Sequence, residues 1–498
     1  MSRWILPSLL VLVAGASPSY AQPGDPDLAK ALALERAMQK IISQHEASIV
    51  CILVSRSDAY QEFGQGPDPN QPGKLGAFSL QALRGNGRYK KLSEDKQRTH
   101  WEQLLDFDHP GYVPRAFGSG VVIDAKGKVL TNYHVVQDAT KIFVRLPGGQ
   151  SSYADIYAAD PRCDLAVLNL LNTDVLPLKA VPLGDADRMQ RGQFILTLSN
   201  PFAAGFRDGQ PSASWGILSN IRRKSFPHLK EEERIKPFHA YGTLLQTDAR
   251  LNLGCSGGAM FNLSGEMVGL ITSIAAIQGG ETPGGFAVPV NAAMRRIIDV
   301  LKRGEEIDYG FLGVAFDPTS GNGSPGVILK SVSKGSPADA AKLMIGDVLI
   351  AVNGQSINDS DDVYTSVGIH LSGSKVSVRY RRKGIEHVTD VTLAKLYVPG
   401  KHIATTLGGR PYFRGLRVDY ASLVVQQPGR PFAHIPAGVL VIDVQPGSAA
   451  DKANVKIGDI ITHINGISVP TPPAFHQSAG NGPLELTLFG IPNKLVLK

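Results

Sequence analysis

Hydrophobic residues come in short runs over much of the chain, and polar turn residues separate one run from the next. Representative runs occupy residues 49–54, 120–124, 141–145 and 165–168. Short runs bounded by turn residues are typical of strands in an all-β barrel or sandwich. The 53 glycines and 33 prolines favour the same turn-rich architecture over a helical bundle.

Apolar residues occur at helical spacing in two other segments. Within residues 22–45 this spacing predicts a helix from Pro26 to about His45, which either packs on the β-rich part or serves in assembly. The positions that carry it are Leu28, Ala31, Leu32, Leu34, Ala37, Met38, Ile41 and Ile42. A second helix is expected from Asn291 to Arg303, where the β-rich region 46–303 ends.

Residues 55–115 interrupt the strand pattern inside this region. They are polar and contain many glycines and prolines, which is typical of a long surface insertion. A lid over an active site and an inert loop both fit this composition.

The last third of the chain contains an internal repeat. Ser336 returns as Ser448, 112 positions later, and two neighbouring motifs return at the same distance. The repeated segments are 335–341 with 447–453, 345–347 with 457–459, and 352–354 with 464–466. A repeat of this length predicts two duplicated small domains, at 304–398 and 399–498, and not a solenoid.

The first 21 residues have the pattern of an export signal. Arg3 supplies a positive start, residues 5–16 are apolar, and Ser19-Tyr20-Ala21 is a small-x-small cleavage site. A membrane anchor is the alternative, but a spanning helix needs about 20 apolar residues and two prolines interrupt this run. We expect cleavage after residue 21, a periplasmic or secreted protein, and no later membrane segment.

The whole-chain numbers limit the classes of function. A chain of 498 residues is too long for one hydrophobic core, so two to four domains are expected. The net charge of +7 comes from scattered lysines and arginines, which gives no basis for nucleic-acid binding. Three cysteines cannot all pair within one chain, so packing must stabilise the fold. No metal and no other cofactor is expected.

Three residues together suggest amide hydrolysis. Gly254-Cys255-Ser256-Gly257-Gly258 exposes a hydroxyl and lets the amides of Gly254 and Ser256 point at one oxyanion. His134 follows a strand-like run, and Asp164 precedes another. Each residue alone has an ordinary structural explanation, but their order of His, Asp and Ser is that of the chymotrypsin arrangement. It differs from the orders of subtilisin and of the α/β-hydrolases, which disfavours a lipase or esterase.

Six motifs in the correct order make this sequence similar to the HtrA/Deg serine proteases. They are 118–123, 131–136, 164–168, 246–249, 254–258 and 285–289. The resemblance implies a mostly β fold, with a chymotrypsin-like double six-stranded β-barrel followed by two α+β PDZ domains. It also implies an ATP-independent endopeptidase of the bacterial envelope that degrades unfolded or damaged proteins and assembles as a trimer or a multiple of trimers.

The first repeat begins with a segment that resembles a PDZ carboxylate-binding loop. Its residues are Tyr309, Gly310, Phe311, Leu312, Gly313 and Val314. Successive backbone amides there hold a peptide C-terminus while the peptide adds as a strand. Residues 413–418 match less well, and the prolines at 470, 472 and 473 crowd the expected groove helix. A purely structural second PDZ domain therefore remains open.

Two positions depart from the expected pattern. Cys255 stands where the family usually has Asn, and with Cys163 beside Asp164 it raises a redox hypothesis against the alternative of two buried, unreactive thiols. Arg250 lies where a chymotrypsin-type enzyme builds its specificity pocket. An inward guanidinium would favour cleavage after acidic residues. We expect it to face solvent, with a preference for medium-sized apolar residues, because a buried unpaired arginine is costly.

Two rival functions are a proteolytically silent chaperone of the same fold and a PDZ scaffold without chemistry. A pseudoprotease usually lacks a triad residue, and none is missing here. The scaffold reading leaves the N-terminal motifs unexplained.

Overall fold

We analysed a computed structural model, which describes residues 26–56, 116–173, 176, 178–223, 238, 243–272, 284–316, 325–398, 403–404, 412–426, 437–478, 480 and 482–497. The predicted export signal lies outside these residues. Nearly all of the predicted insertion at 55–115 also lies outside them.

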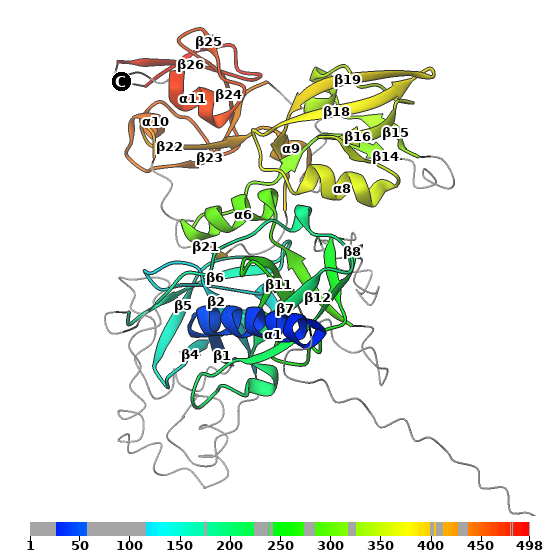
Figure 1. Ribbon diagram of the computed structural model, residues 1–498. Helices are drawn as coiled ribbons and strands as arrows, with labels where there is room; N and C mark the ends of the chain where they lie inside the picture. The colour runs from blue at the N-terminus through cyan, green and yellow to red at the C-terminus, as the bar shows by residue number, and fades with distance from the viewer. Residues whose placement is uncertain are drawn as a thin grey trace, which may run out of the picture.

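The first half of the β-rich region forms a closed six-stranded barrel (Figure 1). The strand order is β5-β4-β1-β2-β3-β6, and pairing of β5 with β6 closes the ring. The strands are β1 (Ile49–Ser55), β2 (Phe117–Val122), β3 (Lys128–Thr131), β4 (Lys141–Arg145), β5 (Ser151–Asp160) and β6 (Leu165–Leu170). Every residue of β1 is buried, because its two faces pack on different clusters of apolar side chains.

The second half forms another closed six-stranded barrel, in the order β10-β11-β12-β9-β8-β7. Its strands are β7 (Phe194–Ser199), β8 (Ser212–Arg223), β9 (Leu244–Thr247), β10 (Ala259–Asn262), β11 (Met267–Thr272) and β12 (Gly285–Pro289). The mostly β fold with two closed barrels, predicted from the resemblance, is confirmed.

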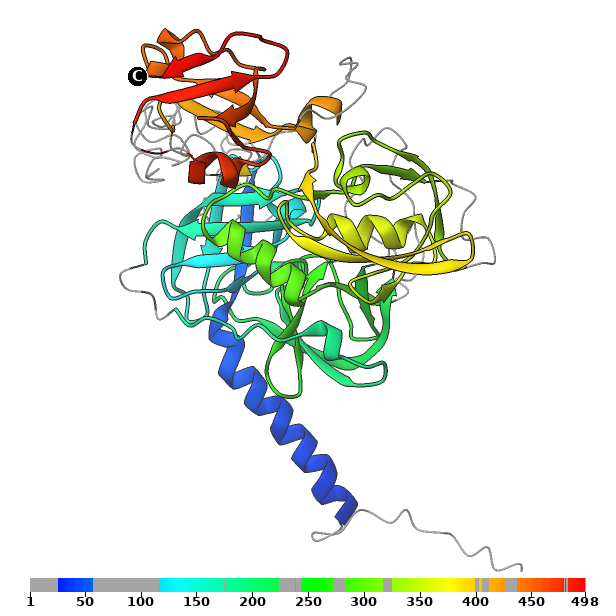
Figure 2. The same cartoon turned by 90° about the horizontal axis from the view of Figure 1, so that it is seen from above.

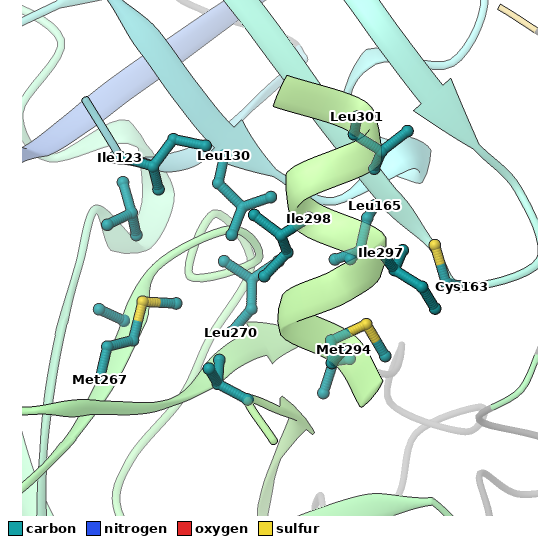
Figure 3. Close-up of a cluster of buried hydrophobic side chains, with 14 of the residues drawn as sticks. Ile123, Leu130, Cys163, Leu165, Met267, Leu270, Met294, Ile297, Ile298 and Leu301 are labelled. Atoms are coloured by element: carbon teal, nitrogen blue, oxygen red, sulfur yellow. The ribbon is translucent and has the colours of Figure 1, made fainter. Parts of the chain in front are cut away.

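Helix α6 (Ala292–Lys302) packs against both barrels (Figure 3). Its buried residues Met294, Ile297, Ile298 and Leu301 point toward side chains of β3, β6 and β11, which Figure 3 labels as Leu130, Leu165 and Leu270. Each such side chain contributes about 1.5–3 kcal/mol when it is fully buried. The helix starts cleanly because Asn291 accepts a hydrogen bond from the Met294 amide.

Helix α1 (Pro26–His45) meets the barrels only near its C-terminal end and projects away from them over most of its length (Figure 2). Ile41 is buried in the shared core, and the His45 ring stacks on Phe261 with centroids 4.8 Å apart. The short helical turn η1 (Glu46–Ser48) joins α1 to β1. Three others lie between strands: α5 (Tyr133–Val136), η3 (Ala186–Arg188) and η4 (Pro201–Ala203).

The repeat appears in the structure as two sheets with the same strand order. The first runs β14-β15-β16-β18-β19 and the second β22-β23-β24-β26-β27, with β17 and β25 each paired to its third strand. The first contains β14 (Val314–Phe316), β15 (Val327–Val332), α7 (Pro337–Ala340), β16 (Val348–Val352), β17 (Gln355–Ser356), α8 (Ser360–Gly368), β18 (Lys375–Arg382) and β19 (Ile385–Thr392).

The second contains β22 (Leu416–Tyr420), α9 (Ser422–Gln426), β23 (Val439–Val444), α10 (Ala449–Lys452), β24 (Ile460–Ile464), β25 (Ile467–Ser468), α11 (Pro472–Ser478), β26 (Leu484–Leu488) and β27 (Leu495–Leu497). The repeated serines have equivalent structural roles. The hydroxyls of Ser336 and Ser448 accept hydrogen bonds from the amides of Asp339 and Asp451, and so cap the N-termini of α7 and α10.

Our doubt about the groove helix of the second repeat was wrong. Helix α11 begins at Pro472, a position where the missing N–H of proline costs nothing. Its residue Phe475 is fully buried in the core of the second repeat.

One short pairing closes the first repeat, and another ties the C-terminal part of the chain to the first barrel. Strand β13 (Gly310–Phe311) pairs with β20 (Ala394–Lys395), and β21 (Ile403–Ala404) pairs with β5 of the first barrel. In the part of the chain described here, no helix is long and apolar enough to cross a membrane. The same residues contain no group of three or more His, Cys, Asp or Glu side chains placed to hold a metal ion.

Candidate active site

His134 and Asp164 form a hydrogen-bonded pair. His134 lies in α5, just after β3, and Asp164 lies just before β6, which pairs with β3. The Nδ1 of His134 is 2.8 Å from Asp164 Oδ2 and 3.0 Å from Oδ1. Because an ionised carboxylate only accepts, the imidazole must donate from Nδ1, which leaves Nε2 as the basic nitrogen.

The backbone around Asp164 is fixed from both sides. Asp164 has a φ of 55°, in the left-handed region that few non-glycine residues adopt. Its carbonyl accepts hydrogen bonds from the Tyr133 amide and the Asn132 side chain, each at 3.1 Å. Its carboxylate also accepts from the His134 amide at 3.0 Å. These contacts compensate the strain of the turn and aim the carboxylate at the imidazole.

Opposing influences act on the imidazole. Burial lowers the pKa of His134, whereas the charge of Asp164 and its hydrogen bond raise it, and Arg56 lowers it again. The net pKa lies above the ordinary value of 6.5. The side chain keeps 41% of its surface exposed, while Asp164 keeps 7%, so the imidazole remains accessible to a reacting group.

Ser256 lies on a loop that requires glycine on either side. Gly254 and Gly257 have φ values of 92° and 85°. A Cβ at Gly257 would lie 2.0 Å from the Ser119 carbonyl oxygen, and one at Gly254 would lie 2.5 Å from the Asn200 carbonyl oxygen. The Ser256 residue itself is 5% exposed.

Ser119 of β2 holds this loop from the other barrel. Its amide donates to the Ser256 carbonyl and its hydroxyl to the Gly254 carbonyl, each at 2.7 Å. Ser119 belongs to the motif 118–123, but the sequence alone did not indicate a role for it. The signal was a small hydroxyl residue between two glycines, which fits close approach of another backbone segment.

The Ser256 loop thereby reaches the segment that carries His134. A Cβ built on Gly118 would lie 2.6 Å from a methyl group of Val135 and 3.2 Å from the Ser256 carbonyl oxygen. The residue after His134 and the backbone of Ser256 therefore contact the same glycine. Strand β2 therefore contacts both the Ser256 loop and the helical turn that carries His134.

The cysteines are free and buried in the described structure. Burial raises the pKa of the Cys51 thiol to about 12 and that of Cys163 well above its usual range. Cys255 accepts a hydrogen bond from the Asn252 amide at 3.3 Å, and so takes a place in the turn before the nucleophile. Neutral, buried thiols at 51 and 163 are poor nucleophiles, which favours the unreactive alternative for Cys163.

The remaining candidate residues lie in different environments. Arg250 is exposed, and its amide donates to the Ser214 hydroxyl. Tyr309 is fully buried among residues of the first barrel, whereas Gly310 and Phe311 form β13. Gly313 packs on Ser336, and Gly415 packs on Ser448 in the same way, so the poorer second match adopts an equivalent loop.

Fold and site define a trypsin-like serine endopeptidase with two PDZ domains, and comparisons agree. The trypsin-like peptidase domain family matches residues 118–270, and the PDZ domain family matches 310–393 and 440–478. The "Probable periplasmic serine endoprotease DegP-like" of Pseudomonas putida (strain W619) is 31% identical over 381 residues, which are 74% of this chain and 75% of the relative. A protein of the same name from Ectopseudomonas mendocina (strain ymp) is 33% identical over 376 residues, 73% and 74% of the two chains.

The chain belongs to the family of DegP-like serine endoproteases. The resemblance inferred from the sequence is therefore confirmed, as is the class of enzyme.

Proposed function

We propose that this chain is an exported, ATP-independent endopeptidase that degrades unfolded or damaged proteins with His134, Asp164 and Ser256. The observation that carries the proposal is the hydrogen-bonded pair of His134 and Asp164 beside the Ser256 loop. Ser256 Oγ attacks the scissile carbonyl while Nε2 of His134 accepts its proton. His134 then donates this proton to the leaving amine. In the second half of the reaction water attacks the acyl-enzyme while His134 accepts its proton, and return of that proton to Ser256 releases the product acid.

Asp164 fixes the imidazole tautomer and stabilises the imidazolium. The backbone amides of Gly254 and Ser256 donate to the oxyanion of each tetrahedral intermediate. Both are main-chain groups, so the change to Cys255 leaves this chemistry intact. The exposure of Arg250 supports a specificity pocket for medium-sized apolar residues, which unfolded proteins offer and folded proteins hide.

The first PDZ domain binds peptide C-termini in this proposal. The terminal carboxylate meets backbone amides of the loop 311–314, because the Gly310 amide already donates to the His370 carbonyl at 2.7 Å. The peptide pairs with β14. Strand β14 is at the edge of its sheet, so its outer side is available for such a strand. We also propose a periplasmic or secreted location, as in the relatives named periplasmic, and assembly into trimers or multiples of trimers.

The deciding experiment measures degradation of casein by the mature chain and by Ser256→Ala. We expect the alanine variant to lose more than about 10⁴-fold in rate, because the nucleophile carries the whole reaction. Ser264→Ala, an exposed serine in the turn between β10 and β11, is the matched control and should retain full activity.

Equal degradation by wild type and Ser256→Ala would refute the triad. No degradation by either, with suppressed aggregation of unfolded protein by both, would instead establish the silent chaperone.

A further inference from the structure

The turn between β5 and β6 is organised by one buried carboxylate. Asp160 begins this turn and Asp164 ends it. Asp160 Oδ1 accepts hydrogen bonds from the amides of Arg162 at 2.7 Å and Cys163 at 3.0 Å. Asp160 is 3% exposed, so each of these bonds replaces water that the carboxylate gave up on folding. The path of the backbone into Asp164 therefore depends on how Asp160 is held.

A third donor to the same oxygen comes from the start of the first PDZ domain. The hydroxyl of Tyr309 donates to Asp160 Oδ1 at 2.9 Å. Tyr309 is 0% exposed, and burial together with the charge of Asp160 raises its pKa well above 10, so the hydroxyl stays protonated and remains a donor. A hydrogen bond to a buried charged acceptor is among the stronger ones in proteins.

The aromatic ring of Tyr309 also contacts this turn, through the side chain of Arg162. The Arg162 guanidinium lies 4.6 Å from the centre of the Tyr309 ring and 4.5 Å from that of Phe238. The two rings meet edge to face, with centroids 5.4 Å apart. A Cβ at Gly368, where α8 ends, would lie 2.8 Å from Arg162 Nη2. The turn is thus in contact with two parts of the first PDZ domain, its first residues and its helix.

We propose that Tyr309 is a positioning residue for the peptidase reaction, because its hydroxyl acts through Asp160 to hold Asp164 opposite His134. The inference rests on the triad proposed above and adds a residue outside both barrels. The Tyr309 side chain is fully buried and its hydroxyl is bonded to Asp160, so this side chain does not face a peptide. Instead, the first PDZ domain contributes part of the scaffold that orients the catalytic aspartate.

Tyr309→Phe tests the role of the hydroxyl, because the ring keeps its contacts with Arg162 and Phe238. Asp160 then loses one of its three donors, and Asp164 is held less firmly. With a short chromogenic peptide as substrate, we expect kcat to fall about tenfold, the worth of one hydrogen bond to a charge, with KM unchanged. The acidic limb of kcat against pH should also move to lower pH, since Asp164 raises the pKa of His134.

The matched control is Tyr420→Phe. Tyr420 is also buried, at 7% exposed, and its hydroxyl bonds to Ser372 within the PDZ part of the chain. Removing that hydroxyl leaves the turn at 160–164 untouched, so kcat and the acidic limb should stay at their wild-type values. Thermal unfolding of both variants, measured alongside, separates loss of positioning from general loss of stability.

The outcomes distinguish this inference from the proposed function. Wild-type kcat and an unmoved acidic limb in Tyr309→Phe, with cleavage still abolished by Ser256→Ala, would overturn the positioning role alone. Equal losses in Tyr309→Phe and Tyr420→Phe would also overturn it. A wild type without Ser256-dependent cleavage would overturn both.

Discussion

In the proposed mechanism the protonation of His134 decides activity, and the groups around its imidazole give the sign of the expected pH dependence. The base must be neutral to accept the proton of Ser256. Its pKa is raised above 6.5, because the charge and hydrogen bond of Asp164 outweigh burial and the charge of Arg56. We therefore expect kcat/KM for a short peptide to fall, as pH is lowered, through a midpoint above 6.5. A midpoint at or below 6.5 would contradict this.

Two substitutions should move that midpoint in opposite directions. Asp164→Asn removes the charge that favours the imidazolium, so the midpoint moves to lower pH while kcat falls about 10⁴-fold. Arg56→Gln removes the charge that opposes the imidazolium, so the midpoint moves to higher pH. The checks are pH–rate profiles of the two variants beside wild type.

Gly257 tests whether the loop of the nucleophile tolerates any side chain. Its φ of 85° is unfavourable for alanine, and the added Cβ would lie 2.0 Å from the Ser119 carbonyl oxygen. Gly384 has nearly the same φ, 84°, but nothing lies within 4 Å of its Cβ position. Gly384→Ala should cost only the backbone strain, about 1–2 kcal/mol. Gly257→Ala should abolish peptide cleavage, because the loop must move away from Ser119.

Activity assays and thermal unfolding of the two variants check this prediction. Retained cleavage in Gly257→Ala would mean that β2 does not fix the Ser256 loop. An equal loss of activity in both variants would point to the shared backbone strain and not to the contact with Ser119.

At the scale of elements, the sequence was a good guide wherever a signal was local. The apolar run at 49–54 corresponds to β1, the helical spacing at 26–45 to α1, and the repeated Ser336 and Ser448 to two equivalent helix caps. The proposed triad residues could be selected from the sequence because their order along the chain matches the chymotrypsin arrangement.

Long-range contacts were beyond the same reasoning. Tyr309 was assigned to a peptide-binding loop, yet its side chain bonds to Asp160, 149 residues earlier. Nothing in the local pattern of either residue marks this contact, since it exists only after the first PDZ domain has docked on the barrel. The expectation that Pro472 would disturb the groove helix was wrong for a related reason. Proline disfavours the interior of a helix but suits its first turn, and only the fold shows that Pro472 lies in the first turn of α11.

At the scale of the whole molecule, one buried lysine connects the two PDZ domains. Lys395 of β20 is 8% exposed and lies 2.8 Å from a carboxylate oxygen of Asp308 and 2.7 Å from one of Asp419 in β22. Burial lowers the pKa of Lys395, but the charges of Asp419, Asp308 and Glu306 more than compensate, and the net pKa is raised. Asp308 leads into the first PDZ domain and Asp419 belongs to the second, so one ammonium group holds both.

Lys395→Met keeps the length of the side chain and removes its charge. Because it leaves two carboxylates close together and largely buried, we expect it to cost about 3–5 kcal/mol and to loosen the second PDZ domain from the first. Hydrogen–deuterium exchange should accelerate in β20 and β22 before it changes in either barrel. The matched control is Lys375→Met, because Lys375 pairs with Asp390 at 2.8 Å but both side chains are more than half exposed. An exposed pair of this kind contributes less than about 1 kcal/mol. Equal exchange in the two variants would show that Lys395 does not join the domains.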